Sequence, residues 1–165
     1  MLGQLYKSLV RGHLEYANTV WCPSKKANID HLERVQRRAT KLVPELKELP
    51  YPERLKQMKL PSLVYRRKRG DMIETYKILN GLVDTIGGAP LQLAEECCKR
   101  SHSLKLKKNH CRTALRQNTF SQRVVNSWNA LPEKIVKAPN LNTFKNLLDR
   151  HWSNHPCLYH YKTNY

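Results

Sequence analysis

The amino-terminal segment, residues 2 to 21, has a strong helical periodicity. At 100° per residue, its apolar side chains and His13 fall on one half of the helical wheel, while Lys7, Arg11 and Glu15 lie opposite. The apolar half contains Leu5, Tyr6, Leu9, Val10, His13, Leu14, Ala17, Val20 and Trp21. This pattern predicts an amphipathic helix that ends near Pro23, with His13 as a hydrogen-bonded core residue rather than a catalytic base.

A second amphipathic helix is predicted from Asn28, a favourable N-cap, to Val43, because Pro44 disfavours helical geometry in the residue before it. The apolar residues occupy one sector of the helical wheel, which we expect to face the core: Leu32, Val35, Ala39, Leu42 and Val43. A separate stripe carries four cations that we expect to face outward and bind phosphate: Arg34, Arg37, Arg38 and Lys41. The i,i+4 pairs Asp30–Arg34 and Glu33–Arg37 would neutralise part of this stripe.

Two further helices are predicted, over residues 52 to 58 and residues 62 to 80, the second of them closed by Gly81 as a C-terminal cap. The longer helix contains four consecutive cations, which are spread around its circumference. We expect Arg66 and Arg67 to face outward and to add to the phosphate-binding surface. A nuclear-localisation role for this basic run is an alternative.

The second half of the chain is predicted to be mostly helical after an irregular stretch that we assign as a linker, residues 84 to 100. Alternating Leu and Lys over 103–108 favours a short strand, with 112–116 as its candidate partner in a β-hairpin. Helical spacing returns at Phe120, Val124, Trp128 and Leu131, and again at Phe144, Leu147, Leu148, His151 and Trp152.

The fold class predicted from these elements is mainly α. It consists of a helical bundle over residues 1–83, the linker over 84–100, a small helical module with a candidate hairpin over 101–152, and a frayed tail over 153–165. The tryptophans and Phe120 lie on apolar stripes, so we expect them to serve core packing rather than base stacking.

Charge changes this picture more than any other property of the composition. The 165 residues include 30 Lys and Arg against 13 Asp and Glu, a formal net charge of +17. Such a chain attracts polyanions, nucleic acid first and an anionic membrane surface second. It has no apolar run long enough to span a membrane and no secretory signal, and its five cysteines lack the regular spacing of a disulfide framework. We therefore expect an intracellular protein, in the nucleus or cytoplasm.

Motifs for catalysis and for metal binding are missing from the sequence. It contains no glycine-rich phosphate loop, no nucleophile elbow and no adjacent aspartates to hold the two metal ions of phosphoryl transfer. The cysteines and histidines lack the paired spacing of zinc modules. We expect no catalytic residue, no metal site, no cofactor and no small-molecule substrate in this chain.

Several ordered motifs between residues 2 and 152 resemble one family. The segments 5–11, 13–16 and 20–21 resemble the region after the palm in LINE-type, non-LTR retrotransposon reverse transcriptases of the jockey-like group. The segment 32–41 looks like the basic helix that follows there, and the motifs RR at 66–67, RGD at 69–71 and YKILNG at 76–81 match the next helix. The last part of the same reading frame is similar at FS (120–121), RVVN (123–126), WN (128–129), LP (131–132), FK (144–145) and LD (148–149).

The resemblance implies a helical thumb over residues 1–83, which grips template and primer, followed by a C-terminal extension. The partners it implies are RNA, DNA or an RNA/DNA hybrid, together with the rest of a retroelement polyprotein. It implies that the palm, with its magnesium-binding aspartates, would precede Met1, so that this chain would not polymerise alone. The sequence departs from the family at Gly12, where a proline is usual, and over 82–100, where the aromatic-rich connection is missing.

Two other functions are compatible with the same residues. One is a basic protein-interaction module or a retroelement remnant without function, in which the cations serve solubility or nuclear import. The other is a sequence-specific helix-turn-helix regulator that uses residues 28–43 as its recognition helix, although a stripe of Arg and Lys directed at phosphates supplies no base-edge specificity.

Overall fold

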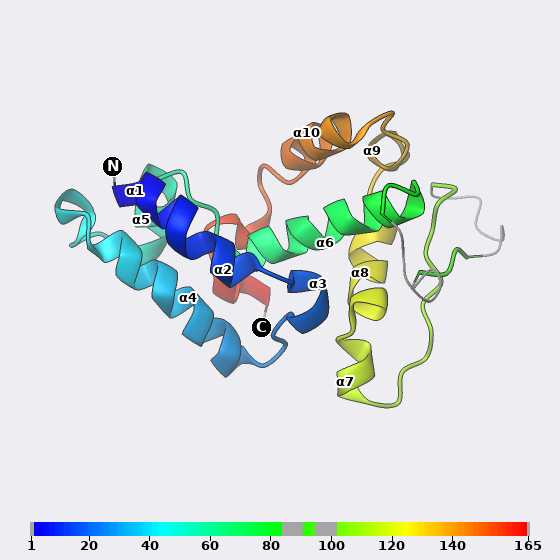
Figure 1. Cartoon of the computed structure of the whole chain (residues 1–165), viewed down its shortest axis with the longest axis horizontal. Helices are drawn as coiled ribbons and strands as arrows, with labels where there is room; N and C mark the ends of the chain where they lie inside the picture. The colour runs from blue at the N-terminus through cyan, green and yellow to red at the C-terminus, as the bar shows by residue number, and fades with distance from the viewer. Residues whose placement is uncertain (1, 84–90, 95–101, 165) are drawn as a thin grey trace. The chain divides into compact units, whose positions relative to one another are not determined.

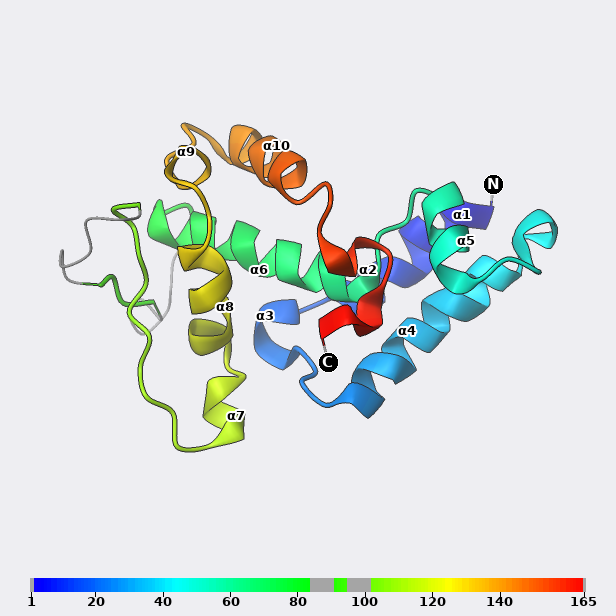
Figure 2. The same cartoon turned by 180° about the vertical axis from the view of Figure 1, so that it is seen from behind.

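A computed structural model describes residues 2–83, 91–94 and 102–164. These residues are mainly helical, as predicted (Figures 1 and 2). The chain divides into two compact units. Unit 1 contains residues 1–68 and 154–165, and unit 2 contains residues 69–153, so the boundary lies within one helix rather than in the predicted linker.

Unit 1 is built around helix α4 (Lys26–Lys41). The shorter helices α1 (Leu2–Leu5), α2 (Arg11–Glu15) and α3 (Asn18–Trp21) precede it, with a π-helical turn, η1 (Tyr6–Val10), between the first two. A 3-10 turn, η2 (Pro44–Leu46), and helix α5 (Tyr51–Gln57) follow it. The first half of α6 (Leu63–Leu79) completes the unit. The core includes Leu55 of α5, Leu60 before α6 and Leu63 at its start, each at most 1% exposed.

The amino-terminal segment is not the continuous helix that its periodicity predicts. Tyr16 is extended and Ala17 has the left-handed conformation (φ 49°), which ends α2 and begins α3 in a new direction. The amide of Asn18 then donates to the carbonyl of Arg67 at 3.1 Å. Much of the predicted apolar face is exposed, including Leu9 (64%) and Val20 (82%).

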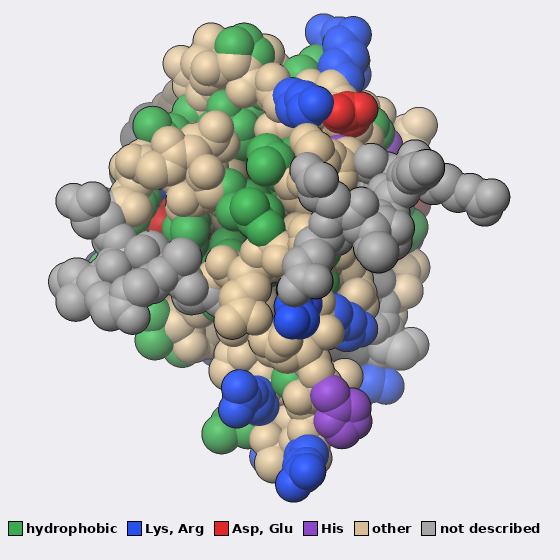
Figure 3. All heavy atoms as spheres, turned by 90° about the vertical axis from the view of Figure 1, so that its right-hand side faces the viewer, with side chains coloured by type: hydrophobic (Ala, Val, Ile, Leu, Met, Phe, Trp, Pro, Cys, Tyr) green, Lys and Arg blue, Asp and Glu red, His purple; other side chains and the backbone are tan. Residues whose placement is uncertain are grey.

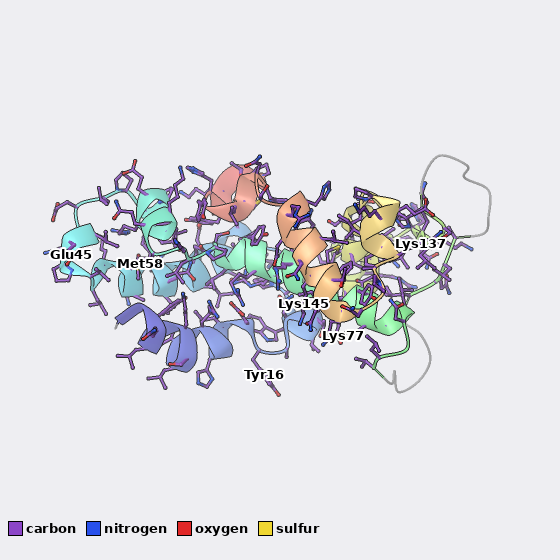
Figure 4. All side chains as sticks on the ribbon, turned by 90° about the horizontal axis from the view of Figure 1, so that it is seen from above. Tyr16, Glu45, Met58, Lys77, Lys137 and Lys145 are labelled. Atoms are coloured by element: carbon purple, nitrogen blue, oxygen red, sulfur yellow. The ribbon has the colours of Figure 1, made fainter. Side chains whose placement is uncertain are left out.

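Two residues of this segment also differ from their predicted roles. His13 is exposed and is therefore not a core histidine. Trp21 is 42% exposed, in contrast to the core position predicted for it. Tyr16 is 75% exposed, and its side chain points away from the ribbon in Figure 4.

Unit 2 packs the second half of α6 against α8 (Phe120–Asn129), α9 (Glu133–Val136) and α10 (Leu141–His151). Its core is apolar and aromatic, with Tyr76 stacked on Phe144 at 4.4 Å between ring centroids and Trp128 at 6.0 Å from the same ring. The hydroxyl of Tyr76 donates to the carbonyl of Ala138 at 2.6 Å. The predicted C-terminal cap Gly81 has φ +65°, a conformation that glycine adopts without steric cost.

The predicted hairpin between 103–108 and 112–116 does not form. Within the described ranges the chain has no β-strand, and the only pairing is an isolated antiparallel bridge between Leu93 and Leu106. Residues Ala114–Gln117 instead form the short helix α7, capped by the Thr113 side chain. The partner of the 103–108 segment is thus 91–94, where Leu91 is buried, while the rest of the predicted linker, 84–90 and 95–100, lies outside the described residues.

The carboxyl-terminal segment is also ordered, whereas a frayed tail is predicted from its lack of periodicity. It forms two 3-10 turns, η3 (Pro156–Leu158) and η4 (Tyr161–Asn164). Cys157 is fully buried, and its carbonyl accepts a hydrogen bond from Ser62 Oγ at 2.5 Å. The backbone of Ser62 also donates to the carbonyl of Leu158 at 2.8 Å, which ties the segment to the start of α6.

Candidate nucleic-acid interface

The buried side of α4 is mostly polar. Glu33, Gln36 and Thr40 are each 0% exposed, and Ile29 is the apolar member of the same face. None of the five predicted core residues of this helix is fully buried: Val35 and Leu42 are exposed, and Leu32, Ala39 and Val43 are half-buried. At 100° per residue, the buried face is rotated by roughly 100° from the predicted one.

A hydrogen-bond network explains why polar side chains occupy this core. The hydroxyl of Tyr6 donates to Gln36 Oε1 at 2.7 Å, and Gln36 Nε2 donates to the hydroxyl of Tyr51 at 3.2 Å. Tyr51 in turn donates to Glu33 Oε1 at 2.9 Å, and the backbone N–H of Leu63 donates to Glu33 Oε2 at 3.2 Å. Because buried polar groups are tolerated when their hydrogen bonds are made, the network holds α4 in one rotation.

Burial also changes the acid–base properties of this network. Desolvation raises the pKa of the Glu33 carboxyl above its usual value, although the hydrogen bond from Tyr51 and the positive charge of Arg67 oppose the change. Burial likewise raises the pKa of Tyr6 and of Tyr51, and the carboxylate of Glu33 adds to both increases. Both tyrosines therefore remain hydroxyl donors at neutral pH.

Three of the four predicted cations of α4 are exposed. We refer to Arg34, Arg38 and Lys41 as the α4 basic stripe. Their i, i+4, i+7 spacing places them within about 60° on one side of the helix and spreads them over about 10 Å along its axis. In the described part of the chain, none of them forms an ion pair.

The acidic residues predicted to neutralise this stripe make other contacts. Glu33 is bound to Tyr51 and to the backbone of Leu63, as described above. Asp30 interacts with the hydroxyl of Tyr161 and contributes to the raised pKa of that tyrosine, which burial causes in the first place. Neither the Asp30–Arg34 nor the Glu33–Arg37 ion pair forms within the described ranges, so the positive charge of the stripe faces solvent.

Arg37 does not extend into solvent with the other three cations. Its guanidinium donates to the hydroxyl of Tyr161 at 2.7 Å and lies 5.2 Å from the ring centroid of Tyr51 and 5.8 Å from that of Tyr161. It therefore attaches the carboxyl-terminal segment to α4. A change at Arg37 would alter the fold of unit 1 as well as any binding.

The two predicted cations of α6 do not form an outward-facing pair. Arg67 is only 4% exposed, which corrects the expectation that it faces solvent. Arg66 is half-buried and forms a bidentate ion pair with Glu15, in which its Nη2 atom donates to Oε2 at 2.8 Å. The reason is the packing of α2 against α6, which supplies a carboxylate from a distant part of the sequence.

The described residues offer no candidate metal site and no membrane-spanning helix. The described residues contain no group of three or more His, Cys, Asp and Glu side chains placed to hold a metal ion. Two of the five cysteines, Cys97 and Cys98, lie outside these residues. None of the helices in the described ranges is both long and apolar enough to cross a membrane.

A feature of unit 2 that the sequence reading missed is a pocket lined by amide side chains between residues 108–111 and helices α7 and α8. Asn118, Gln122 and Asn126 contribute to its wall, and their spacing of four residues is the signal that could have revealed it.

Comparison with known proteins adds no family to these observations. No protein-family model, no curated protein and no solved structure matches the chain.

Proposed function

We propose that this chain binds nucleic acid through its phosphates, with the α4 basic stripe as the main contact. The observation that carries the proposal is the exposure of Arg34, Arg38 and Lys41 on one side of α4 without a carboxylate partner among the described residues. Arg and Lys side chains spaced over about 10 Å can contact successive phosphates of one strand. The net charge of +17 supports a polyanionic partner.

We further propose that the chain is the thumb and C-terminal extension of a LINE-type reverse transcriptase. This assignment rests on the ordered motifs between residues 2 and 152 and on the mainly helical fold. On this proposal its partners are RNA, DNA or a hybrid duplex held at a polymerase site that lies in another part of the polyprotein. Phosphate contacts carry no sequence information, so they allow binding to nucleic acids of many sequences. A subdomain that holds a changing template needs this property.

The test is the salt dependence of binding to a labelled primer–template duplex, measured by fluorescence anisotropy. Each phosphate contact contributes about 0.9 to the negative slope of log affinity against log salt. The triple variant R34Q/R38Q/K41Q should therefore bind more weakly and should reduce the magnitude of the slope by up to about 2.7. An unchanged slope would contradict the proposal.

A matched control removes three exposed cations from elsewhere in unit 1. The variant K7Q/K47Q/K56Q has the same change in net charge, and its three sites lie on η1, after η2 and on α5. We expect its slope to stay close to that of the wild type. If both triple variants lose the same slope, binding depends on overall charge and the assignment to α4 is wrong.

One observation favours a protein partner as the second candidate. Val35 and Leu42 are 39% and 68% exposed and lie beside the basic stripe, at about 80–100° from Arg34. An acidic amphipathic peptide would contact both the cations and these apolar side chains. V35S/L42S should weaken such a complex and leave duplex affinity nearly unchanged, so the variant separates the two functions.

A helix-turn-helix regulator would give a different result in the same assay. Binding to a pool of randomised duplexes would then select a sequence, whereas the phosphate contacts proposed above predict nearly equal affinity across the pool.

A further inference from the structure

The amide pocket of unit 2 has the dimensions and the chemistry of a ligand site. It has a volume of about 730 Å³, within the range of small-molecule pockets, and it is open to solvent on one side. Lys108, Asn109 and Cys111 line one wall, while Gln117, Gln122 and Asn126 from α7 and α8 line the other. None of its lining residues belongs to the α4 basic stripe.

One acceptor in this pocket has no hydrogen-bond partner. The Oε1 atom of Gln122 is buried, and no described residue donates to it. The neighbouring amide of Asn126 accepts from Lys108 Nζ at 3.2 Å, and that of Asn118 donates to the carbonyl of Ala114 at 2.8 Å. Burying an unpaired amide oxygen is unfavourable, so a small rotation of the Gln122 side chain that brings this oxygen to a donor of a ligand in the pocket would complete the network.

The positive charge around the pocket indicates that the ligand also has an anionic group. Lys108 and His110 are exposed at its rim, and Arg112 and Arg116 are exposed next to lining residues in the sequence. Figure 3 shows Lys and Arg side chains and a histidine in the lower half of the view, where α7 lies in Figure 1. The guanidinium of Arg123 is instead committed to both oxygens of Asp71, each at 2.9 Å.

Amide side chains both donate and accept, as the edges of nucleobases do, and glutamine forms a bidentate pair with adenine. Cations at the rim match a phosphate. We propose that the amide pocket binds an unpaired nucleotide of a single strand, with Gln122 contacting the base and Lys108 contacting the phosphate. No Phe, Tyr or Trp is among the described residues that line the pocket, and hydrogen bonds would select the base, because stacking on the ring of His110 tolerates any base.

This inference goes beyond duplex binding by α4, and its test uses ligands without a duplex. The full chain is titrated with AMP and with ribose 5-phosphate, which has the same phosphate and no base, and binding is followed by NMR chemical shifts. We expect AMP to bind about tenfold more tightly, as one bidentate base contact predicts. Equal affinities, or no binding of either compound at millimolar concentration, would overturn the proposal.

Two variants separate the base contact from the phosphate contact. Q122L should remove the preference for AMP over ribose 5-phosphate, and it should fold normally because it deletes a buried unpaired acceptor. K108Q should weaken both ligands by a similar factor and leave their ratio unchanged. The control Q57L makes the same change as Q122L at an exposed site of α5 and should behave as the wild type. A normal AMP preference in Q122L would contradict the assigned role.

The source of the nucleotide is tested with an adenylate tetramer. A strand supplies further phosphates to Arg112 and Arg116, so it should bind at least about tenfold more tightly than AMP at low salt. Equal affinity would overturn the assignment to a strand in favour of a free mononucleotide.

An independent readout uses Cys111, whose thiol lines the same pocket. The tetramer should slow alkylation of Cys111, measured by peptide mass spectrometry, in the wild type but not in Q122L at the same concentration. Alkylation at an unchanged rate in a sample that has bound the tetramer would place the ligand outside the pocket. Loss of duplex binding in the α4 variant, by contrast, leaves every one of these results unaffected.

Discussion

Helices α4 of unit 1 and α8 of unit 2 both have an apolar side in their sequences, yet only α8 buries it. Val124, Val125 and Trp128 of α8 are each at most 1% exposed, whereas α4 buries Glu33 and Gln36. In unit 2 the buried side of the helix is apolar, so burial of this side by the hydrophobic effect is the main determinant of its rotation. In unit 1 a polar network decides it, and this rotation determines which cations reach solvent.

The largest effect is expected from removing the centre of the network. Gln36 links Tyr6 to Tyr51 and also donates to the carbonyl of Pro61 at 3.1 Å. Q36L leaves several of these groups buried without partners, and we expect it to lower the free energy of unfolding by about 3 kcal/mol in urea denaturation. Q57L, at an exposed site, should change it by less than about 0.5 kcal/mol. A stable Q36L variant would show that the network does not hold α4.

The same substitution on the two helices tests the comparison directly. Val124 of α8 is 1% exposed and Val35 of α4 is 39% exposed. V124A should lower the free energy of unfolding by about 2 kcal/mol, because it removes buried methyl groups and leaves a cavity. V35A should lower it by less than about 0.5 kcal/mol. Equal losses in urea denaturation would mean that α4 buries its apolar side after all.

The pH dependence of stability reports on Glu33, a group that α8 lacks. Because its pKa is raised in the folded state, Glu33 binds its proton more tightly there than in the unfolded chain. Its contribution to stability is complete below the unfolded pKa and is lost as pH rises through the folded pKa. Relative to E33Q, the wild type should therefore lose unfolding free energy as the pH rises above about 4, the ordinary pKa of a glutamate, until the carboxyl of the folded protein has also ionised. A constant difference across this range would contradict the buried carboxyl.

The smallest effect concerns the break that separates α2 from α3. Ala17 has φ 49°, a conformation that favours glycine, so A17G should raise the free energy of unfolding by about 0.5–1 kcal/mol. A39G, in the interior of α4, should lower it by about 1 kcal/mol. Thermal or urea unfolding of the pair gives opposite signs if the break is present and the same sign if the segment is one helix.

The sequence correctly predicted the features of the fold that depend on residues close together in the chain, namely helix ends and the spacing of apolar residues. Pro61 and Gly81 mark the start and end of α6, and the apolar spacing of Val124 and Trp128 identified the buried side of α8. The exposure of three α4 cations was also predicted, whereas their contact with phosphate stays a prediction. These successes need only periodicity and capping, which neighbouring residues determine.

The remaining features depend on partners that are distant in the sequence. Glu33 is buried because Tyr51 and the backbone of Leu63 bind it, and Arg66 is paired because α2 brings Glu15 to it. The carboxyl-terminal segment lacks periodicity, yet the backbone of Ser62 and the guanidinium of Arg37, which donates to the hydroxyl of Tyr161, hold it in place. Because these paired residues are far apart in the sequence, local sequence patterns could not predict their contacts.

The most direct test of the account asks which side of α4 contacts nucleic acid. His31 is exposed and continues the α4 basic stripe by one turn toward the amino terminus. A photoreactive benzoylphenylalanine placed at His31 is compared with one at Gln57, an exposed site on α5. We expect crosslinks to a labelled primer–template duplex from position 31 and not from position 57. Crosslinks from position 57 alone, or equally from both, would contradict it.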